Sequence, residues 1–329
     1  MSGKKSHKRR PRPPSPTEVA VAEEAEAEPR QGTRRAGPFA SVLLGSGGSS
    51  LPPVMRSLGR GFLAVAVQPA LLVGTFLVVL LAWLGLIVLG FEGAPSRMVD
   101  LLAMAPISTY FDLGTGASLF GIGTGFLIFT GVALVMRTFV YAALAGVIVE
   151  ALEDGRVSVY GVIRGVRALP TVLVVQVLSF SLIVGGNIIF PVLGPGIGFL
   201  GFVAALVAGL FFLGFAPTAA VRQGRPAQET IRRSGRAALM PGGRHLMLCT
   251  LYFFLALPVV VGFSPGGTDI TASPTLVTWV FVLAVNLLHI GFMAAFAYRW
   301  IVAEAAVPEE PIRRRATRRT PPARARALR

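Results

Sequence analysis

Long apolar blocks constrain this chain more than any other feature of its sequence. Six blocks lie between two polar tails, at approximately residues 69–91, 120–149, 170–190, 196–221, 245–263 and 275–302. A helix needs about 20 apolar residues to cross the roughly 30 Å hydrocarbon core of a bilayer, and each block has about that length. We therefore predict an all-α polytopic membrane protein with six transmembrane helices.

The composition excludes an ordinary soluble domain. Hydrophobic residues make up 53% of the 329 residues, charged residues 14%, and the mean hydropathy is +0.67. Soluble domains carry about 25% charged residues. The single cysteine, Cys249, excludes an internal disulfide.

The two ends of the chain lack the apolar period that a packed core requires. The N-terminal tail contains the basic "KKSHKRRPRPPSP", the acidic "EVAVAEEAEAEP" and the linker-like "GSGGSS", whereas the C-terminal tail contains "RRRATRRTPPARARALR". Such compositions are typical of disorder. We predict disordered cytoplasmic tails over residues 1–50 and 304–329, with the transmembrane domain at 51–303.

The distribution of basic residues predicts the orientation. If the N-terminus is cytoplasmic, 29 of the 31 lysines and arginines fall in the tails and inner loops, and only Arg97 falls in an outer loop. Cytoplasmic loops of membrane proteins carry this excess. Both termini should therefore face the cytoplasm. The net charge of +15 is explained by topology, and without an aromatic-basic motif we expect no nucleic-acid partner.

Three basic segments share one design, each placed before an inward-starting span. They are "SLPPVMRSLGRGFLAVAVQP", "SVYGVIRGVRALP" and "QETIRRSGRAALMP". Each has arginines three or four residues apart, an apolar face and a proline before the next span. We expect three cytoplasmic interfacial helices, in a unit of interfacial helix and two spans that occurs three times. In the second copy, Ser158 is the expected N-cap.

The arginines of these segments are the predicted ligands for anionic lipid headgroups, because arginine side chains at the interface reach lipid phosphates. They are Arg56, Arg60, Arg164, Arg167, Arg232, Arg233 and Arg236. In the third segment, Glu229 precedes Arg233 by four residues, which favours an ion pair between them.

Two of these stretches also resemble a known family. "GFAPTAAVRQGRPAQETIRRSGRAAL", with Arg233 and Ser234, and "EALEDGRVSVYGVIRGVRAL" resemble the six-span membrane domain fused to some bacterial glycerophosphodiester phosphodiesterases. Related uncharacterised six-span families share the pattern. The resemblance covers roughly residues 50–303 and implies a bacterial membrane protein. It does not bring the phosphodiesterase activity, because the chain has no room for the catalytic barrel.

A few polar residues fall inside the predicted spans, where an ionisable group is a functional candidate. Arg137 is the strongest, with two structural alternatives: its side chain snorkels to the interface, or it pairs with Glu150 or with carbonyls of a neighbouring helix. Asn286 and His289 share one helix face and either line a polar path or make interhelical hydrogen bonds. We expect no metal site and no cofactor.

These features lead to a non-enzymatic membrane protein that organises lipids or the cell envelope, or forms the membrane part of a complex. A transporter is the alternative, although the sequence shows no discontinuous helix. An intramembrane enzyme acting on lipids is the third, for which no paired acid and base are found.

Overall fold

The structure is a computed structural model that describes residues 51–88, 95–107, 123–240, 244–261 and 274–307. All of them belong to one compact unit, Gly37–Arg329. The described residues form helices and no strand, which confirms the all-helical class. The predicted N-terminal tail, 1–50, and residues 308–329 of the predicted C-terminal tail lie outside the described residues.

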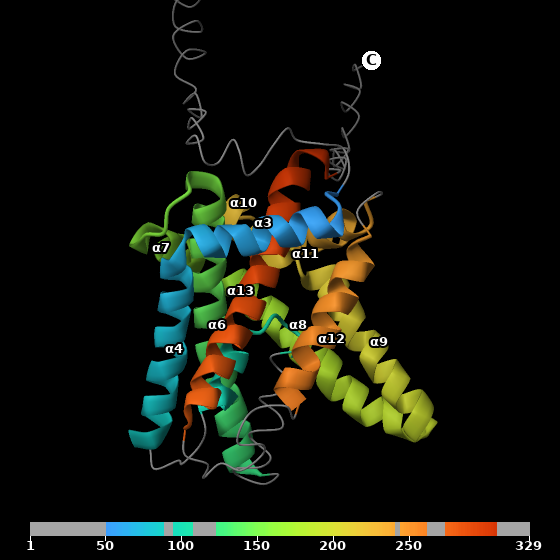
Figure 1. Cartoon of the computed structure of the whole chain (residues 1–329). Coiled ribbons are helices and arrows are strands. Elements are labelled where there is room, and N and C mark those ends of the chain that lie inside the picture. The colour runs from blue at the N-terminus through green and yellow to red at the C-terminus, as the bar shows by residue number, and fades with distance from the viewer. Residues whose placement is uncertain (1–50, 89–94, 108–122, 241–243, 262–273, 308–329) are drawn as a thin grey trace, which may run out of the picture. The chain divides into compact units, whose positions relative to one another are not determined.

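Ten α-helices and three short 3-10 helices are found in the described part of the chain (Figure 1). In chain order they are α3 (Val54–Val67), α4 (Pro69–Val88), η1 (Pro95–Leu102), α6 (Thr124–Asp154), α7 (Val159–Arg167), α8 (Leu169–Ile189), η2 (Phe190–Leu193), α9 (Pro195–Leu213), α10 (Ala216–Gln223), α11 (Ala227–Ala238), α12 (His245–Val261), α13 (Leu276–Ala303) and η3 (Glu304–Ala306).

Several of these helices are long and apolar enough to cross a membrane. Four meet that criterion among the described residues: Thr124–Asp154, Leu169–Gly186, Gly196–Gln223 and Leu276–Ala306. A fifth is reached if the bent pair α3 and α4 counts as one span. In α12 the apolar part, His245–Ala256, is shorter. The structure therefore has four or five membrane-length helices, and six spans stay a prediction.

Helices also form at the three basic segments. α3, α7 and α11 lie at one end of the bundle, which we call the basic end (Figure 1). Ser158 is the N-cap of α7, as predicted, and its Oγ accepts a hydrogen bond from the backbone N–H of Tyr160. α3 meets α4 at an angle of 81° where Pro69 begins the new helix.

Each of these three helices packs on a long helix that rises to the basic end. α7 lies on α6, and α11 contacts α9 and α10, so both pack on the helix that precedes them in sequence. α3 makes its largest contact with α13, the last long helix. The first described helix, α3, therefore packs against the last long helix, α13.

Small side chains make these close approaches possible. A Cβ atom on Gly61 of α3 would lie 2.5 Å from the carbonyl oxygen of Gly291 in α13. Gly165 of α7 approaches the backbone at Ala142 of α6 at least as closely. In α11, Ser234 Oγ donates a hydrogen bond to the carbonyl oxygen of Phe212, at 2.6 Å. Backbones pack this closely only where the side chains are small.

The three helices share a pattern that supports the predicted repeat. Two small buried residues stand four apart, with an arginine directly before the second: Ser57, Arg60 and Gly61; Gly161, Arg164 and Gly165; Thr230, Arg233 and Ser234. Each of the three helices therefore buries a pair of small residues one turn apart, and larger apolar side chains such as Met55, Val159 and Ile163 are exposed.

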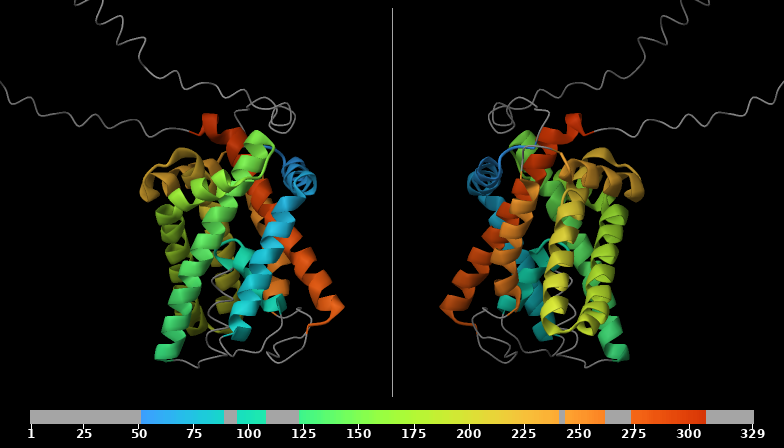
Figure 2. Two further views of the ribbon diagram at one scale, coloured as in Figure 1. Left: turned by 90° about the vertical axis from the view of Figure 1, so that its left-hand side faces the viewer. Right: turned by 90° about the vertical axis from the view of Figure 1, so that its right-hand side faces the viewer.

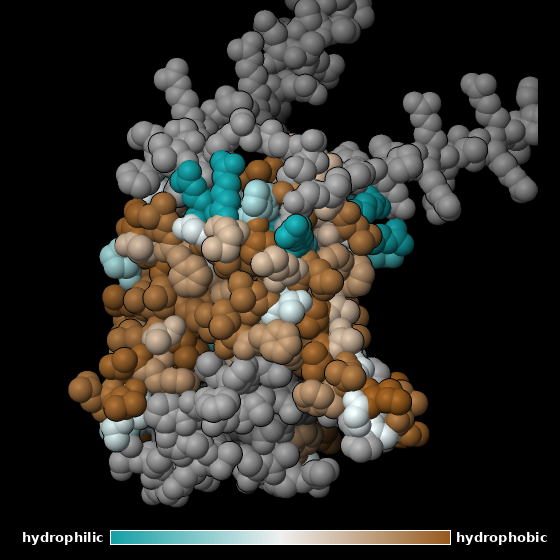
Figure 3. Space-filling model, turned by 45° about the vertical axis from the view of Figure 1, so that its right-hand side comes forward, coloured by the Kyte–Doolittle hydropathy of each residue, from teal (hydrophilic) through white to brown (hydrophobic). Residues whose placement is uncertain are grey.

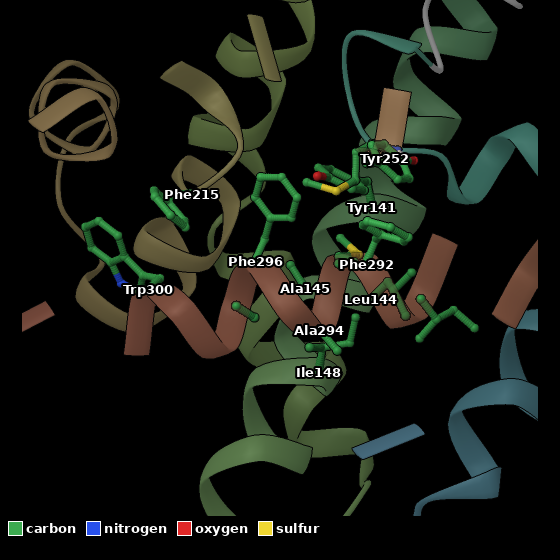
Figure 4. Close-up of a cluster of buried hydrophobic side chains, with 14 of the residues drawn as sticks. Tyr141, Leu144, Ala145, Ile148, Phe215, Tyr252, Phe292, Ala294, Phe296 and Trp300 are labelled. Atoms are coloured by element: carbon green, nitrogen blue, oxygen red, sulfur yellow. Dashed lines mark hydrogen bonds between the residues drawn. The ribbon is translucent and has the colours of Figure 1, made fainter. Parts of the chain in front are cut away.

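The interior is an apolar core in which α13 crosses α6. Ala294 of α13 lies with Ala145 and Ile148 of α6 in a cluster of buried side chains (Figure 4). At the basic end of the same cluster, Trp300 and Phe215 lie with ring centroids 6.0 Å apart. The buried residues of α13 continue as far as Ala303. In the most apolar part of this helix, 67% of the residues are buried.

The segment at residues 95–107 differs from the prediction. The sequence analysis placed residues 92–117 in an outer loop, but this segment lies among the helices at about the middle of their length (Figure 2). Leu102 and Ile107 are fully buried, and η1 contacts α4, α6 and α13. Irregular backbone at membrane depth occurs where protein surrounds it. Residues 108–122 lie outside the described part.

The C-terminal boundary also differs. The sequence analysis began the disordered tail at Glu304, but Glu304–Ala306 form η3 and Val307 is buried. Glu304 makes an ion pair with Arg222 and accepts a hydrogen bond from Gln223. These contacts hold the end of α13 to α10.

Candidate functional site

The structure brings buried polar side chains from four elements together inside the bundle. They are Asp100 on η1, Arg137 on α6, Tyr252 on α12, and Asn286 and His289 on α13, and we call this group the polar centre. All five have exposed fractions of 2% or less. The sequence analysis selected Arg137, Asn286 and His289, but not Asp100 or Tyr252.

Arg137 is held by η1. Its Nη2 donates a hydrogen bond to the backbone carbonyl oxygen of Asp100, at 2.9 Å, and the side chain is 1% exposed. The Asp100 carboxylate is close enough to the guanidinium for the two opposite charges to interact. Snorkelling is therefore wrong for Arg137, because a snorkelling side chain would reach the surface. The alternative in which Arg137 binds a carbonyl of a neighbouring helix is confirmed, and that helix is η1.

Glu150, the carboxylate proposed as a partner for Arg137, is used elsewhere. Its Oε1 accepts a hydrogen bond from Ser158 Oγ at 2.6 Å, and its Oε2 accepts one from the Ser158 backbone N–H at 3.1 Å. Arg156 Nε lies 3.6 Å from Oε1. Glu150 thus fixes the start of α7 against α6, and pairing with Arg137 is wrong.

Tyr252 joins α12 to two other elements. The backbone N–H of Met104 donates to the Tyr252 oxygen at 2.8 Å, and this oxygen lies 2.9 Å from His289 Nδ1. The two rings are edge to face, at 74°. The prediction that His289 makes an interhelical hydrogen bond is confirmed, with α12 as the partner helix.

Asn286 behaves differently from His289. It lies one helical turn before His289 on the same face of α13 and is fully buried, yet neither of its amide atoms has a hydrogen-bond partner among the residues that the structure describes. Within the same described part, the Nε2 atom of His289 has none either. Interhelical hydrogen bonding, one of the two alternatives given for this pair, is therefore not found for Asn286 among the described helices.

The seven predicted headgroup arginines differ in how exposed they are. Arg56, Arg167 and Arg232, one on each of α3, α7 and α11, are exposed. Arg60 and Arg236 are half-buried. Arg233 is 4% exposed, which is at odds with the prediction that it reaches lipid phosphates. Arg164 is half-buried and binds Glu153, and its predicted headgroup role stays a prediction. Both occupy the arginine position of the shared pattern, which faces the neighbouring long helix.

Arg164 belongs to an ion-pair network at the basic end. Its Nη1 lies 2.7 Å from Glu153 Oε2, and its Nε donates to the carbonyl oxygen of Val221. Arg222 Nε lies 2.7 Å from Glu153 Oε1, and Arg222 also pairs with Glu304. The network joins α6, α7, α10 and η3, and the sequence analysis did not find it.

The expected pair of Glu229 with Arg233 is replaced by another. Glu229 Oε1 lies 3.4 Å from Arg225 Nη1, on the opposite side along the chain. Arg233 turns toward the interior, so it is not placed to meet Glu229 at the surface. The spacing of four residues fits both pairs, and packing of the buried face selects one.

No cluster of three metal-ligating side chains occurs in the part of the chain that the structure describes. The polar centre holds one carboxylate and one imidazole, fewer than a closed protein metal site uses. Its chemistry is that of hydrogen bonding around one buried pair of opposite charges.

Comparison with protein families, with curated proteins and with solved structures found no match for this chain. The resemblance to the six-span membrane domain therefore stays a prediction.

Proposed function

We propose that the chain is a six-span integral protein of a bacterial cell membrane with both termini in the cytoplasm. It is non-enzymatic, binds anionic lipid headgroups at its basic end, and organises membrane lipids or the envelope as the membrane part of a larger complex. The six-span family named above remains the expected relationship.

One observation carries this proposal: exposed apolar side chains cover the long helices, and arginines collect at one end. Large hydrophobic residues are exposed along the lengths of α4, α6, α8 and α9, among them Leu81, Val135, Leu178 and Phe199. Figure 3 shows the apolar surface with hydrophilic side chains at the basic end. An exposed apolar surface of this extent fits lipid tails, and arginines at its border fit phosphates.

Within the basic end, Arg56, Arg167 and Arg232 are the residues best placed for lipid. Each is exposed on a different helix of the shared pattern. A basic side chain near an anionic leaflet contributes about 1 kcal/mol. This corresponds to roughly fivefold in affinity for each arginine.

The test is the lipid composition that purifies with the full chain. In mild detergent, the protein should retain anionic phospholipid above its share of the membrane. The triple variant Arg56→Gln, Arg167→Gln and Arg232→Gln should lose this enrichment, and the matched variant with three lysines should keep it. Equal enrichment in the glutamine variant overturns the lipid role. Proteins that co-purify identify the complex.

A transporter is the second candidate, and a specific observation favours it. The sequence analysis found no discontinuous helix, but η1 now lies among the helices with Asp100 beside Arg137. Broken helices with ionisable residues at membrane depth are typical of transporter binding sites. Flux of a solute into proteoliposomes is the measurement that separates this candidate from the first.

A further inference from the structure

Asn286 and His289 carry buried polar atoms with which no side chain or backbone group of the described residues forms a hydrogen bond. Both side chains are fully buried, and the unpaired atoms are the amide oxygen and nitrogen of Asn286 and Nε2 of His289. More than nine-tenths of buried polar atoms in proteins have a partner. An unpaired one costs the desolvation of the group, and at membrane depth no surrounding water offsets that cost.

The unpaired atoms on α13 are of both hydrogen-bonding kinds. The Asn286 oxygen accepts and its nitrogen donates. When the Tyr252 hydroxyl donates to His289 Nδ1, at 2.9 Å, the neutral imidazole carries its proton on Nε2, which then donates. A molecule that fits this face must itself donate and accept hydrogen bonds.

The charges of the polar centre further restrict the kind of molecule that could bind there. Arg137 carries a positive charge and Asp100 a negative one, and the two are within electrostatic range. Their charges cancel, so the centre has no net charge to attract an ion. An uncharged solute avoids the large cost of moving an ion into the low-dielectric interior.

We propose that the polar centre binds a small uncharged solute with hydroxyl groups, of the polyol class, through Asn286 and His289. This inference rests on the transporter candidate. The segment 95–107 holds two members of the polar centre in place, because the Met104 N–H donates to the Tyr252 oxygen and the Asp100 carbonyl oxygen of η1 accepts from Arg137. Asn286 and His289 then form the hydrogen bonds with the solute, and η1 keeps the side chains around them in position.

Binding is tested on the purified full chain with glycerol as the probe. Glycerol should raise the melting temperature of the wild-type protein more than that of Asn286→Leu, which has similar shape and no amide. Losing one buried hydrogen-bonding side chain should weaken binding about tenfold. Sucrose, a larger osmolyte, should stabilise both proteins equally. Ser181→Ala, an exposed position on α8, is the control and should respond like the wild type.

Transport is tested separately in proteoliposomes, by light scattering after an osmotic step of glycerol. The wild type should admit glycerol faster than empty vesicles, and Asn286→Leu should not. Without glycerol, Asn286→Leu should melt at the wild-type temperature or above it, because the change removes unpaired atoms. His289→Phe, which keeps an aromatic ring against Tyr252, provides a second variant if Asn286→Leu does not fold.

The outcomes of the two experiments distinguish a failure of the proposed binding site from a failure of the transporter proposal. If glycerol stabilises the wild type and both variants equally, the site is overturned. If glycerol stabilises the wild type more but does not enter the proteoliposomes, the site stands and transport fails. A variant that melts well below the wild type while binding glycerol normally shows a purely structural role for its side chain, which also overturns the proposal.

Discussion

Nη2 of Arg137 lies 2.9 Å from the backbone carbonyl oxygen of Asp100, and this contact joins α6 to the buried segment η1. The guanidinium is 1% exposed and the Asp100 side chain 2%. A buried arginine therefore helps to hold η1 among the long helices, and in the sequence this arginine is seen only as an isolated charge in an apolar block.

We predict that Arg137→Leu destabilises the protein by about 3–5 kcal/mol, because it leaves the Asp100 carboxylate buried without its opposite charge. The double variant Arg137→Leu with Asp100→Asn should recover much of this loss. Melting temperatures of the single and double variants in detergent give the coupling between the two residues. Additive effects would show that the two charges do not interact.

Gly61 and Gly59 of α3 form a matched pair for the packing of α3 on α13. A Cβ at position 61 would meet the backbone of Gly291 and Ala295, whereas at position 59 nothing lies within 4 Å. Gly61→Ala should cost about 1–3 kcal/mol through overpacking. Gly59→Ala should be neutral or stabilising by up to about 1 kcal/mol, since alanine favours helix. Similar melting temperatures for the two variants would contradict the close approach.

Ser158 should be important for stability because it both caps α7 and binds Glu150. Its Oγ accepts from Tyr160 N–H and donates to Glu150 Oε1. Ser158→Ala should lower stability by about 1–2 kcal/mol. Ser181→Ala removes a hydroxyl that bonds only within its own helix, so thermal unfolding should show a change below about 0.5 kcal/mol.

The network around Glu153 should make stability depend on salt. Glu153 pairs with Arg164 and Arg222, whose side chains are 23% exposed, so each pair contributes at most about 1 kcal/mol. Glu153→Gln should lower the melting temperature at low salt, with a smaller effect at high salt. Arg156→Gln removes a charge that is 68% exposed and should change little. A salt-independent loss in Glu153→Gln would argue against ion pairing.

The sequence predicted much of the fold because helix length and charge distribution are local properties. The N-cap at Ser158, the helices α3, α7 and α11, and the start of α4 at Pro69 are found at the predicted places. The apolar blocks likewise correspond to long helices. These features need only the chain's own spacing.

The positions of individual side chains were harder to predict, because they depend on which faces meet. The sequence analysis treated the arginines of the basic segments alike, but buried small residues beside Arg164 and Arg233 turn those two inward. Asp100 was missed since it lies in a predicted loop. Its apolar neighbours in "MVDLLAMAPI" were the signal that this loop is buried.

Cysteine labelling tests the six-span topology most directly. The buried Cys249 is first replaced by serine, and single cysteines are placed at Val192, which is 84% exposed between α8 and α9, and at the exposed Gln228 of α11. Leu102 is unsuitable because it is fully buried. An impermeant maleimide should label Val192→Cys on intact cells, and Gln228→Cys only after permeabilisation. Labelling of both positions from outside, or of Gln228→Cys alone, would contradict six spans with the basic end in the cytoplasm.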